Sequence, residues 1–378
     1  MRTVASELHG DYIDLMTIRF YLRLLQKIIL VMYSKKFNKF LMPYKYTFIT
    51  TYKCNSRCNI CGIWRIYQNN PGMLENEIDK EEMKKIIKSI KDDVLWLNFT
   101  GGEPILKEGL AEVIKYAYDN CPNLAMINIP CNGLMPELTF EFFKKFVPYC
   151  KNIDIFVTVS LDAIGKDYVK TRGLDGYDKV VKSFNLLNEF SKKYTNLNVS
   201  YQMTISKLNE DSAKKTFDFI KDKGKPIVTF AHNASMFHNK GVNIDVRTEK
   251  ESISKIIDKV EKEYPVNSLI SFTPKIYLKL AKTFLKTGQA PITCSAGYST
   301  TTINPYGEVF PCAYIEKSAG NVKEMEYDLK KMLTTEEAEE ARKTVKKCKE
   351  CWQNCEAIPS IFSHPVSVAI KYVKASKW

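Results

Sequence analysis

The chain of 378 residues has only four histidines, and none of them lies within either of its two groups of cysteines. This scarcity excludes metal sites that combine cysteine with histidine, so the ligands that these groups offer are thiolates. Zinc and iron–sulfur clusters are the metal centres that bind sulfur ligands alone.

A secretory signal is also missing, because no short apolar stretch near the beginning ends in a small-residue cleavage site. Eleven cysteines would suit a disulfide scaffold only in a much smaller secreted protein, and eight of the eleven lie in the two groups. We therefore expect a reducing, cytoplasmic environment. No internal repeat or low-complexity segment is visible, and the apolar content of 45% is typical of a globular protein.

Acidic residues are too few to balance the lysines and arginines, which gives a formal net charge of +13 with every thiol neutral. Thiolates bound to iron would lower this charge to roughly +10. A basic balance favours nucleic acid, anionic membranes or phosphorylated substrates as partners. Because no RNA-binding appendage is recognisable, we expect no nucleic acid partner.

Residues 12–33 predict an amphipathic helix that lacks the unbroken apolar character of a membrane span. Arg19, Arg23 and Lys27 recur every four residues and share one face. In a spanning helix they would lie in hydrocarbon at about 2.5–3.5 kcal/mol each, so spanning is disfavoured. A helix in the plane of an anionic membrane fits better, since the basic run 34–40 follows directly. The alternative is a helix that packs on the protein's own surface or on a second copy.

Strand-like and helical stretches alternate from residue 46 to about residue 231. Six β/α units in series predict a parallel sheet with right-handed crossovers, so we expect an α/β fold of the partial (βα)6 TIM-like barrel type. Enzymes of this architecture carry their chemistry at the C-terminal ends of the strands. The strand-like runs are residues 46–52, 94–100, 124–130, 153–161, 197–205 and 227–232.

Three cysteines with the spacing C-x3-C-x2-C follow the first strand: Cys54, Cys58 and Cys61. No fourth cysteine or histidine lies nearby. A closed structural site uses four protein ligands, whereas three thiolates on a cubane cluster leave one iron open to a small molecule. At the end of the second strand, Gly101 and Gly102 of FTGGEP lack side chains, so backbone groups there can approach a ligand closely.

The cysteine spacing and the GGEP segment together resemble the radical S-adenosylmethionine (SAM) enzymes, over roughly residues 46–356. The resemblance implies a [4Fe–4S] cluster on the three cysteines, with SAM chelating the open iron. In this family an electron from a reducing donor such as ferredoxin or flavodoxin cleaves SAM, and the resulting 5′-deoxyadenosyl radical takes hydrogen from a substrate. The resemblance also implies that Gly101, Gly102, Glu103 and Pro104 hold the amino group of SAM.

Other SAM contacts follow from the resemblance alone. Ile60 stands where the family has a hydrophobic residue near the adenine, and Ser160 and Asp162 stand where it has polar contacts to SAM. Arg172 and Asn132 lie in similarly familiar contexts. Weaker candidates are Thr204 and Asn209. Each polar side chain could instead be an ordinary cap or turn residue, and no catalytic residue is assigned.

The second cysteine group comprises Cys294, Cys312, Cys348, Cys351 and Cys355. The spacing C-x12-G-x4-C, followed by C-x2-C-x3-C, resembles the SPASM extension or its shorter form, Twitch, which carry auxiliary four-iron clusters. Five thiols cannot fill two sites, so we expect one auxiliary [4Fe–4S] cluster on Cys294, Cys312 and two of the last three cysteines. The resemblance to Twitch favours Cys348 and Cys351, with Cys355 as the competitor. A structural zinc site is the alternative to a cluster.

These assignments divide the chain into five segments. They are an N-terminal basic segment 1–45, a radical SAM core 46–245, a helical linker 246–293, an auxiliary-cluster domain 294–356 and a basic tail 357–378. The cysteines outside the two groups are expected to be buried and unreactive; they are Cys121, Cys131 and Cys150. His232 and His238 follow the sixth strand, at the end of the barrel where a substrate would bind.

Three functions remain open. The first is radical chemistry on a membrane lipid or lipid-linked molecule, at the cytoplasmic face of a membrane, which the basic N-terminal segment and tail favour. The second is maturation of ribosomal peptides. Many enzymes of that kind carry an N-terminal recognition domain, for which the roughly 45 residues before the barrel are too few. The third is a non-catalytic iron–sulfur or zinc scaffold, which needs neither an open iron nor a SAM site.

Overall fold

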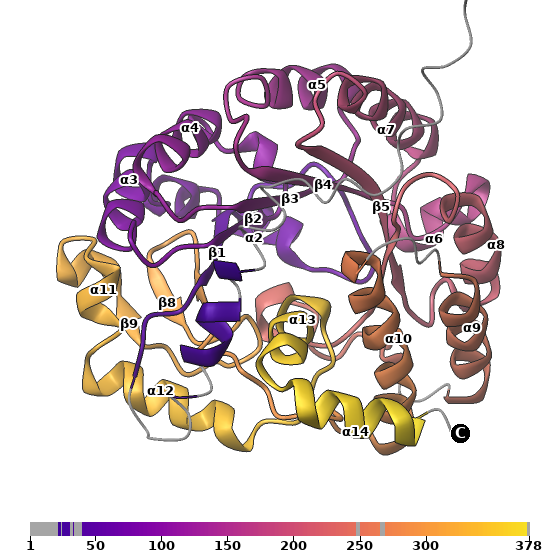
Figure 1. Cartoon of the computed structure of the whole chain (residues 1–378). Coiled ribbons are helices and arrows are strands. Elements are labelled where there is room, and N and C mark those ends of the chain that lie inside the picture. The colour runs from indigo at the N-terminus through magenta and orange to yellow at the C-terminus, as the bar shows by residue number, and fades with distance from the viewer. Residues whose placement is uncertain are drawn as a thin grey trace, which may run out of the picture.

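The computed structural model describes residues 22–23, 25–30, 33, 40–246, 250–264 and 269–375. Its strands form one nine-stranded sheet in the order β6-β5-β4-β3-β2-β1-β7-β8-β9. The first six pair in parallel with helices between them, which confirms the expected partial (βα)6 barrel (Figure 1). They are β1 Lys45–Thr51, β2 Trp96–Gly101, β3 Met126–Cys131, β4 Asp154–Ser160, β5 Leu197–Ile205 and β6 Ile227–Phe230.

Helices cover the outer face of the barrel strands (Figure 1). They are α3 Lys80–Ser89, α4 Leu110–Asn120, α5 Pro136–Lys144, α7 Tyr177–Ser191 and α8 Glu210–Ile220. At the start of α3, the Asp79 carboxylate accepts hydrogen bonds from the backbone N–H groups of Glu81 and Glu82, at 2.8 Å each. The Glu82 carboxylate accepts one from the Asp79 N–H in return. This capping box satisfies N–H groups that the first helical turn leaves open, and so fixes where the helix begins.

The two faces of each barrel strand carry different side chains, because successive residues point to opposite sides. On β4, Ile155, Val157 and Val159 are fully buried in the apolar core, whereas Phe156 and Ser160 face an interior cavity. Other strands place amide and hydroxyl groups in that cavity: Thr47, Asn98, Asn128, Gln202 and Thr229. The barrel therefore has an apolar shell and a lumen that offers many hydrogen-bonding groups.

The C-terminal part of the chain extends the barrel sheet. β7 (Thr300–Ile303) pairs in parallel with β1, and β8 (Glu308–Phe310) and β9 (Gly320–Asn321) follow in antiparallel. A partial barrel leaves β1 with a free edge, and pairing with β7 satisfies its backbone groups. The expected small domain thus shares its sheet with the core. The helices of this part are α9 Lys250–Glu263, α10 Leu269–Thr287, α11 Leu329–Met332, α12 Glu336–Lys347, α13 Asn354–Ser363 and α14 Pro365–Ala375.

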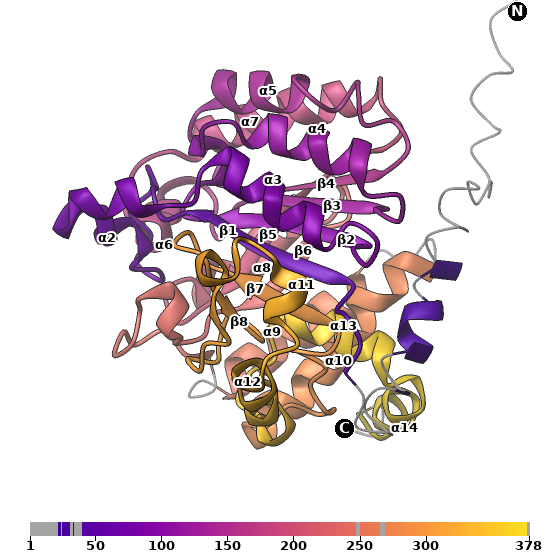
Figure 2. The same cartoon turned by 90° about the vertical axis from the view of Figure 1, so that its left-hand side faces the viewer.

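The two ends of the barrel are built differently (Figure 2). The short helix α2 (Ile66–Asn69), which follows the cysteine loop, lies at the C-terminal end of the strands, and α14 lies at the opposite end. The described residues between 22 and 33 are helical, and they lie at the same end as α14. The rest of the expected helix, together with residues 34–39 of the basic run, lies outside the described residues. In the part of the chain that the structure describes, no helix combines the length and apolar character of a membrane span.

Candidate active site

A cavity of about 460 Å³ lies inside the barrel and reaches from the cysteine loop to the opposite end of the strands. Such a volume is typical of small-molecule sites. At its C-terminal end the cavity is lined by most of the residues that the sequence predicted for SAM and its cluster. These are Cys54, Cys58, Cys61, Ile60, Gly101, Gly102, Glu103, Pro104, Ser160 and Arg172. The fold brings them together from loops and strand ends that are far apart in the sequence.

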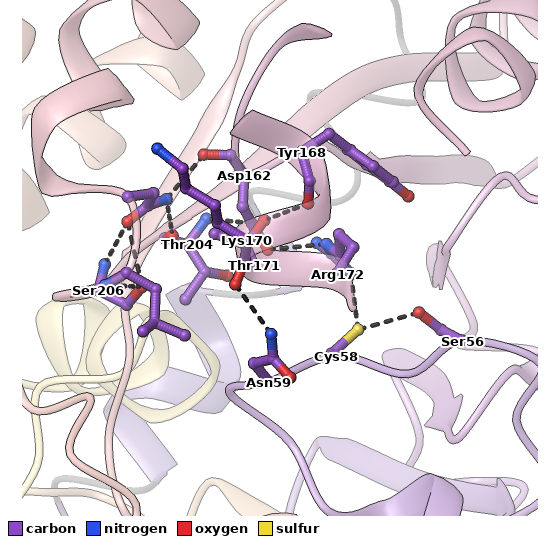
Figure 3. A network of polar contacts seen from close by, with 12 residues as sticks. Ser56, Cys58, Asn59, Asp162, Tyr168, Lys170, Thr171, Arg172, Thr204 and Ser206 are labelled. Atoms are coloured by element: carbon purple, nitrogen blue, oxygen red, sulfur yellow. Dashed lines mark hydrogen bonds and ion pairs between the residues drawn. The ribbon is translucent and has the colours of Figure 1, made fainter. Parts of the chain in front are cut away.

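The cysteine loop presents three thiols to this cavity. Cys58 Sγ lies 3.0 Å from Ser56 Oγ and 3.6 Å from Arg172 Nη1 (Figure 3). Burial raises the pKa of the Cys54 and Cys61 thiols to about 12, so without a cation these thiols hold their protons. Binding to iron supplies the positive charge that displaces those protons.

The three thiols do not form a site for a single metal ion. No three histidine, cysteine, aspartate or glutamate side chains of the described residues converge closely enough to hold one metal ion. The thiolates of a [4Fe–4S] cluster bind separate iron atoms, and so do not need to meet at one point.

The GGEP segment is fixed by the loop beside it. The N–H groups of Gly102 and Glu103 donate to the carbonyls of Thr51 and Lys53, at 2.8 Å each. A Cβ on Gly101 would lie 2.3 Å from the Thr51 oxygen, and one on Gly102 would lie 2.4 Å from the Lys53 oxygen. The sequence suggested that these glycines let a ligand approach the backbone. The structure shows that the backbone after β1 already occupies that space.

Glu103 is the best-defined polar contact for SAM. Its side chain is buried in the cavity wall, and Oε2 accepts a hydrogen bond of 2.7 Å from the Asn132 N–H. Oε1 has no hydrogen-bond partner among the described residues. Burial raises the pKa of this carboxyl to about 7. A buried carboxylate oxygen with a free acceptor position suits an ammonium group, which is what the amino group of SAM offers.

Asn132 supports Glu103 from the side. Its Nδ2 donates to Asn55 Oδ1 at 2.7 Å, and its Oδ1 accepts from the Leu134 N–H at 2.9 Å. Asn132 therefore ties the strand end that holds Glu103 to the cysteine loop. The sequence named it beside Arg172 as a candidate for the SAM site.

Asp162 lies behind Arg172 and does not line the cavity (Figure 3). Its Oδ2 lies 2.8 Å from Arg172 Nε, and its Oδ1 accepts a hydrogen bond of 2.8 Å from the Thr204 N–H. Asn209 Nδ2 donates to the carbonyls of both Asp162 and Thr204, at 2.7 and 2.8 Å. The sequence suggested that Asp162 contacts SAM directly. In the structure its carboxylate instead holds Arg172 beside Cys58.

The five C-terminal cysteines interact electrostatically with one another, so the fold brings them into one group. Backbone N–H groups of Ala296 and Tyr314 donate to the sulfurs of Cys294 and Cys312, at 3.4 and 3.3 Å. Such hydrogen bonds stabilise thiolates and tune cluster potentials. Cys355 lines the cavity directly.

The structure bears on which of the last three cysteines complete the ligand set. Burial raises the pKa of Cys351 and of Cys355, and the neighbouring charge of Cys294 raises both further. Cys348 enters this group through its interaction with Cys351. Cys348 and Cys355 thus both interact with the rest of the group, and the choice between them stays a prediction.

Several cavity residues were not foreseen from the sequence: Lys45, Trp96, Tyr314, Gln353 and Glu356. A lysine at the start of a strand that is otherwise apolar or hydroxylated was the one available signal. The others come from the ends of elements whose packing no local pattern reveals. Cys131, His232 and Ser160 line the cavity as well, and His238 lies outside it.

Two family models match this chain. Residues 48–220 match the radical SAM superfamily, and residues 294–356 match the iron–sulfur cluster-binding SPASM domain. The chain belongs to the radical SAM superfamily. Its cofactors are accordingly a SAM-binding [4Fe–4S] cluster, SAM and auxiliary iron–sulfur, and the residues described above fit all three.

This chain matches only part of the length of its curated relatives. The antilisterial bacteriocin subtilosin biosynthesis protein AlbA of Bacillus subtilis is 25% identical over 75% of this radical SAM chain and 58% of its own. The radical SAM cyclopropyl synthase TigE of Paramaledivibacter caminithermalis is 24% identical over 74% of this chain and 59% of its own. The chain thus spans a little over half the length of these relatives.

Solved structures share the fold. The protein anSMEcpe, with bound AdoMet and the Cp18Cys peptide, superposes with a TM-score of 0.56 and 14% identity, over 89% of this chain and 99% of that one. Streptococcus suis SuiB bound to S-adenosylmethionine gives a TM-score of 0.51 and 16% identity, over 74% and 62% of the two chains.

Proposed function

We propose that this chain is an enzyme that takes a hydrogen atom from a peptide substrate held in the barrel cavity. When bound, the cluster and SAM together supply the 5′-deoxyadenosyl radical that this chemistry needs. The observation that carries the proposal is the meeting of three cavity-facing thiols with the free Oε1 of Glu103 at one end of the cavity. A non-catalytic scaffold needs no such acceptor beside its cluster.

The chain's own residues prepare the site in three ways. Glu103 and Asn132 orient an ammonium group next to the cysteine loop. Arg172 places a cation beside Cys58, with Nη1 3.6 Å from its sulfur. Trp64 lines the cavity and donates through Nε1 to the Cys58 carbonyl at 3.3 Å, which keeps its ring against the loop and helps exclude water.

Two considerations favour a peptide. The relatives include a bacteriocin biosynthesis protein and structures with bound peptides. The lumen also carries side-chain amides, among them Asn98, Asn128 and Gln202, which can donate to and accept from peptide groups. A ferredoxin or flavodoxin is the proposed electron donor.

Anaerobically reconstituted protein with SAM and a strong reductant tests the chemistry. We expect release of 5′-deoxyadenosine, and we expect Cys58→Ala to lose it by at least about 1,000-fold, because the cluster loses a ligand. Cys121→Ala is a matched control, since Cys121 is buried outside the cavity. Equal release from Cys58→Ala and the control protein would refute the proposal.

A lipid substrate is the second candidate, and one surface favours it. Helix α14 exposes Val366, Ile370 and Val373 along one stripe, with the exposed Lys371 and Lys374 to one side of it. The described N-terminal residues expose a similar stripe at the same end of the barrel: Leu22, Leu25 and Ile29. Apolar stripes bordered by cations suit an anionic membrane surface.

Vesicles of phosphatidylcholine with and without phosphatidylglycerol test this surface. Deletion of residues 1–40, or serine at Val366, Ile370 and Val373, should weaken binding to the anionic vesicles. Serine at the exposed residues Leu138 and Val169, on other faces, is the control. Unchanged vesicle binding would remove the support for a membrane-bound substrate. So would variants that bind vesicles normally but no longer associate with a second copy of the chain, because the stripes would then be a contact between copies.

A further inference from the structure

The end of the cavity opposite the cysteines has a chemistry of its own. Lys45 and Trp96 begin β1 and β2, lie opposite each other in the parallel register, and both line the cavity. Seven residues of β1 separate this floor from the cysteine loop, which at about 3.3 Å per residue amounts to about 20 Å. A substrate that touches both ends must be elongated.

Lys45 is a buried lysine whose ammonium is in direct contact with no carboxylate among the described residues. The residue is 1% exposed, and its Nζ donates to the Cys355 carbonyl and lies 4.6 Å from the centroid of the Trp96 ring. Among the described residues, no carboxylate lies within ion-pair distance, 4.0 Å, of Lys45 Nζ. A buried charge is strongly unfavourable unless it is paired, and an ammonium has three donors, of which the Cys355 carbonyl uses one.

Trp96 offers a second open donor at the same place. Its Nε1 is buried and has no hydrogen-bond partner within the described part of the chain. In the wall above it, Asn128 Nδ2 donates to Asn98 Oδ1 at 2.7 Å and Asn98 Nδ2 lies 3.4 Å from Thr47 Oγ1. Lys45 and Trp96 therefore present hydrogen-bond donors side by side at the floor of the cavity.

Two carboxylates also face the cavity near its floor, and their positions matter. Glu356 interacts electrostatically with Lys45, but its Oε2 accepts a hydrogen bond of 2.6 Å from Thr300, on the side of β7. Asp154 begins β4, which lies two strands from β2, or about 10 Å at the usual strand spacing. Neither carboxylate occupies the space between Lys45 and Trp96 within ion-pair distance of the cation.

We propose that Lys45 and Trp96 form a subsite for a carboxylate of the substrate. The Lys45 ammonium and the Trp96 N–H donate to this carboxylate, and the rest of the substrate extends up the barrel toward the cysteine loop. The carboxylate belongs either to the C-terminus of a peptide or to an acidic side chain. This inference rests on the proposed function in one respect only, that the barrel cavity receives the substrate.

Three small peptides probe the subsite on the reconstituted holoprotein. They are N-acetyl-triglycine, its C-terminal amide, and N-acetyl-aspartyl-glycinamide, each titrated by saturation-transfer NMR. We expect the free acid to bind about 10-fold more tightly than the amide. Tight binding of the aspartyl peptide as well assigns the subsite to any carboxylate, whereas its failure restricts the subsite to a C-terminus. Equal affinities for all three peptides overturn the proposal.

Variants test the individual groups. Lys45→Met should remove the preference for the acid, Lys45→Arg should keep it, and the exposed Lys145→Met serves as the matched control. Trp96→Phe keeps an aromatic ring and removes only the N–H, so it should weaken acid binding by about 3-fold even if Lys45→Met does not fold. Glu356→Gln should strengthen acid binding by about 3-fold, because it removes the nearest negative charge. Weaker binding by Glu356→Gln overturns the proposal.

Failure of this inference is distinguishable from failure of the proposed function. Release of 5′-deoxyadenosine by the wild-type protein tests the proposed function, and this assay needs no probe peptide. Lys45 also contacts the carbonyl of Cys355, so the reduction potentials of Lys45→Met should be measured by EPR titration. A shifted potential with unchanged peptide affinities would assign Lys45 to the auxiliary cluster and overturn the subsite.

Discussion

The two ends of the barrel cavity solve different problems. At the cysteine end, the polar groups of Glu103, Arg172 and Asp162 are held by short, mutually dependent contacts. At the floor, Trp96 Nε1 has no hydrogen-bond partner among the described residues, and Lys45 Nζ donates to one carbonyl, that of Cys355. One end is built for cofactors that every member of the superfamily shares, and the other is left open for whatever this protein binds. The following changes should affect the first end far more than the second.

The largest effect is expected from Asp162→Ala. The substitution leaves the buried Arg172 guanidinium without its carboxylate, and breaking a buried ion pair typically costs about 3–5 kcal/mol. Urea unfolding of the protein measures this loss, and isothermal titration should show weaker SAM binding as Arg172 moves away from Cys58. Asp167→Ala is the control, because its ion pair with Lys170 is exposed. A stability within 1 kcal/mol of the wild type would show that Arg172 finds another partner.

Glu103→Gln should have a pH-dependent effect of nearly the same size. Burial raises the pKa of Glu103 from 4.5 to about 7 in the folded protein, so the folded state binds a proton more tightly than the unfolded state. Stability from this group is therefore present below pH 4.5 and is lost as the pH rises through 7. The loss amounts to about 3 kcal/mol, since each pKa unit corresponds to about 1.4 kcal/mol.

The measurement compares melting temperatures of cluster-free wild type and Glu103→Gln. We expect the variant to be the more stable protein at pH 8 and to lose that advantage at pH 5. In the reconstituted protein, Glu103→Gln should bind SAM more weakly than the wild type, because the amide cannot pair with the ammonium of SAM. We expect SAM affinity to fall by about 10-fold or more. Equal melting temperatures of the variant and the wild type at both pH values would show that burial does not raise the pKa of Glu103.

The sequence predicted the cysteine end well for a physical reason. Cys54, Cys58 and Cys61 share one loop, and the GGEP segment is continuous, so short spacings encode them. It predicted the six parallel strands for a similar reason, because each is a local run between turns. Long-range pairing was not encoded in this way. The contact of Arg172 with Cys58 and the union of β7 with β1 join positions far apart in the chain. Lys45 becomes a cavity residue only once Trp96 and Cys355 close around it.

Gly102→Ala should have a smaller effect, confined to the cysteine end. A Cβ would lie 2.4 Å from the Lys53 carbonyl oxygen, so the backbone must shift, at a cost of about 1–3 kcal/mol. The shift moves Glu103 as well, and SAM binding should weaken in step with stability. Gly72→Ala is the control, since no atom lies within 4 Å of the Cβ there. Full SAM affinity with reduced stability would separate the packing role of Gly102 from the position of Glu103.

The smallest effect is expected from Asn128→Ala, in the cavity wall just above the floor. Asn128 Nδ2 donates to Asn98 Oδ1 at 2.7 Å, but both side chains line the cavity, where water can replace the lost partner. The free energy of unfolding should therefore change by less than about 1 kcal/mol, and the release of 5′-deoxyadenosine without substrate should not change. Binding of a peptide that reaches past Asn128 to the floor should weaken, because one amide contact is lost while the cysteine end is intact. A loss of stability as large as that of Asp162→Ala would erase the contrast between the two ends, since it would mean that the floor is as tightly interlocked as the cofactor site.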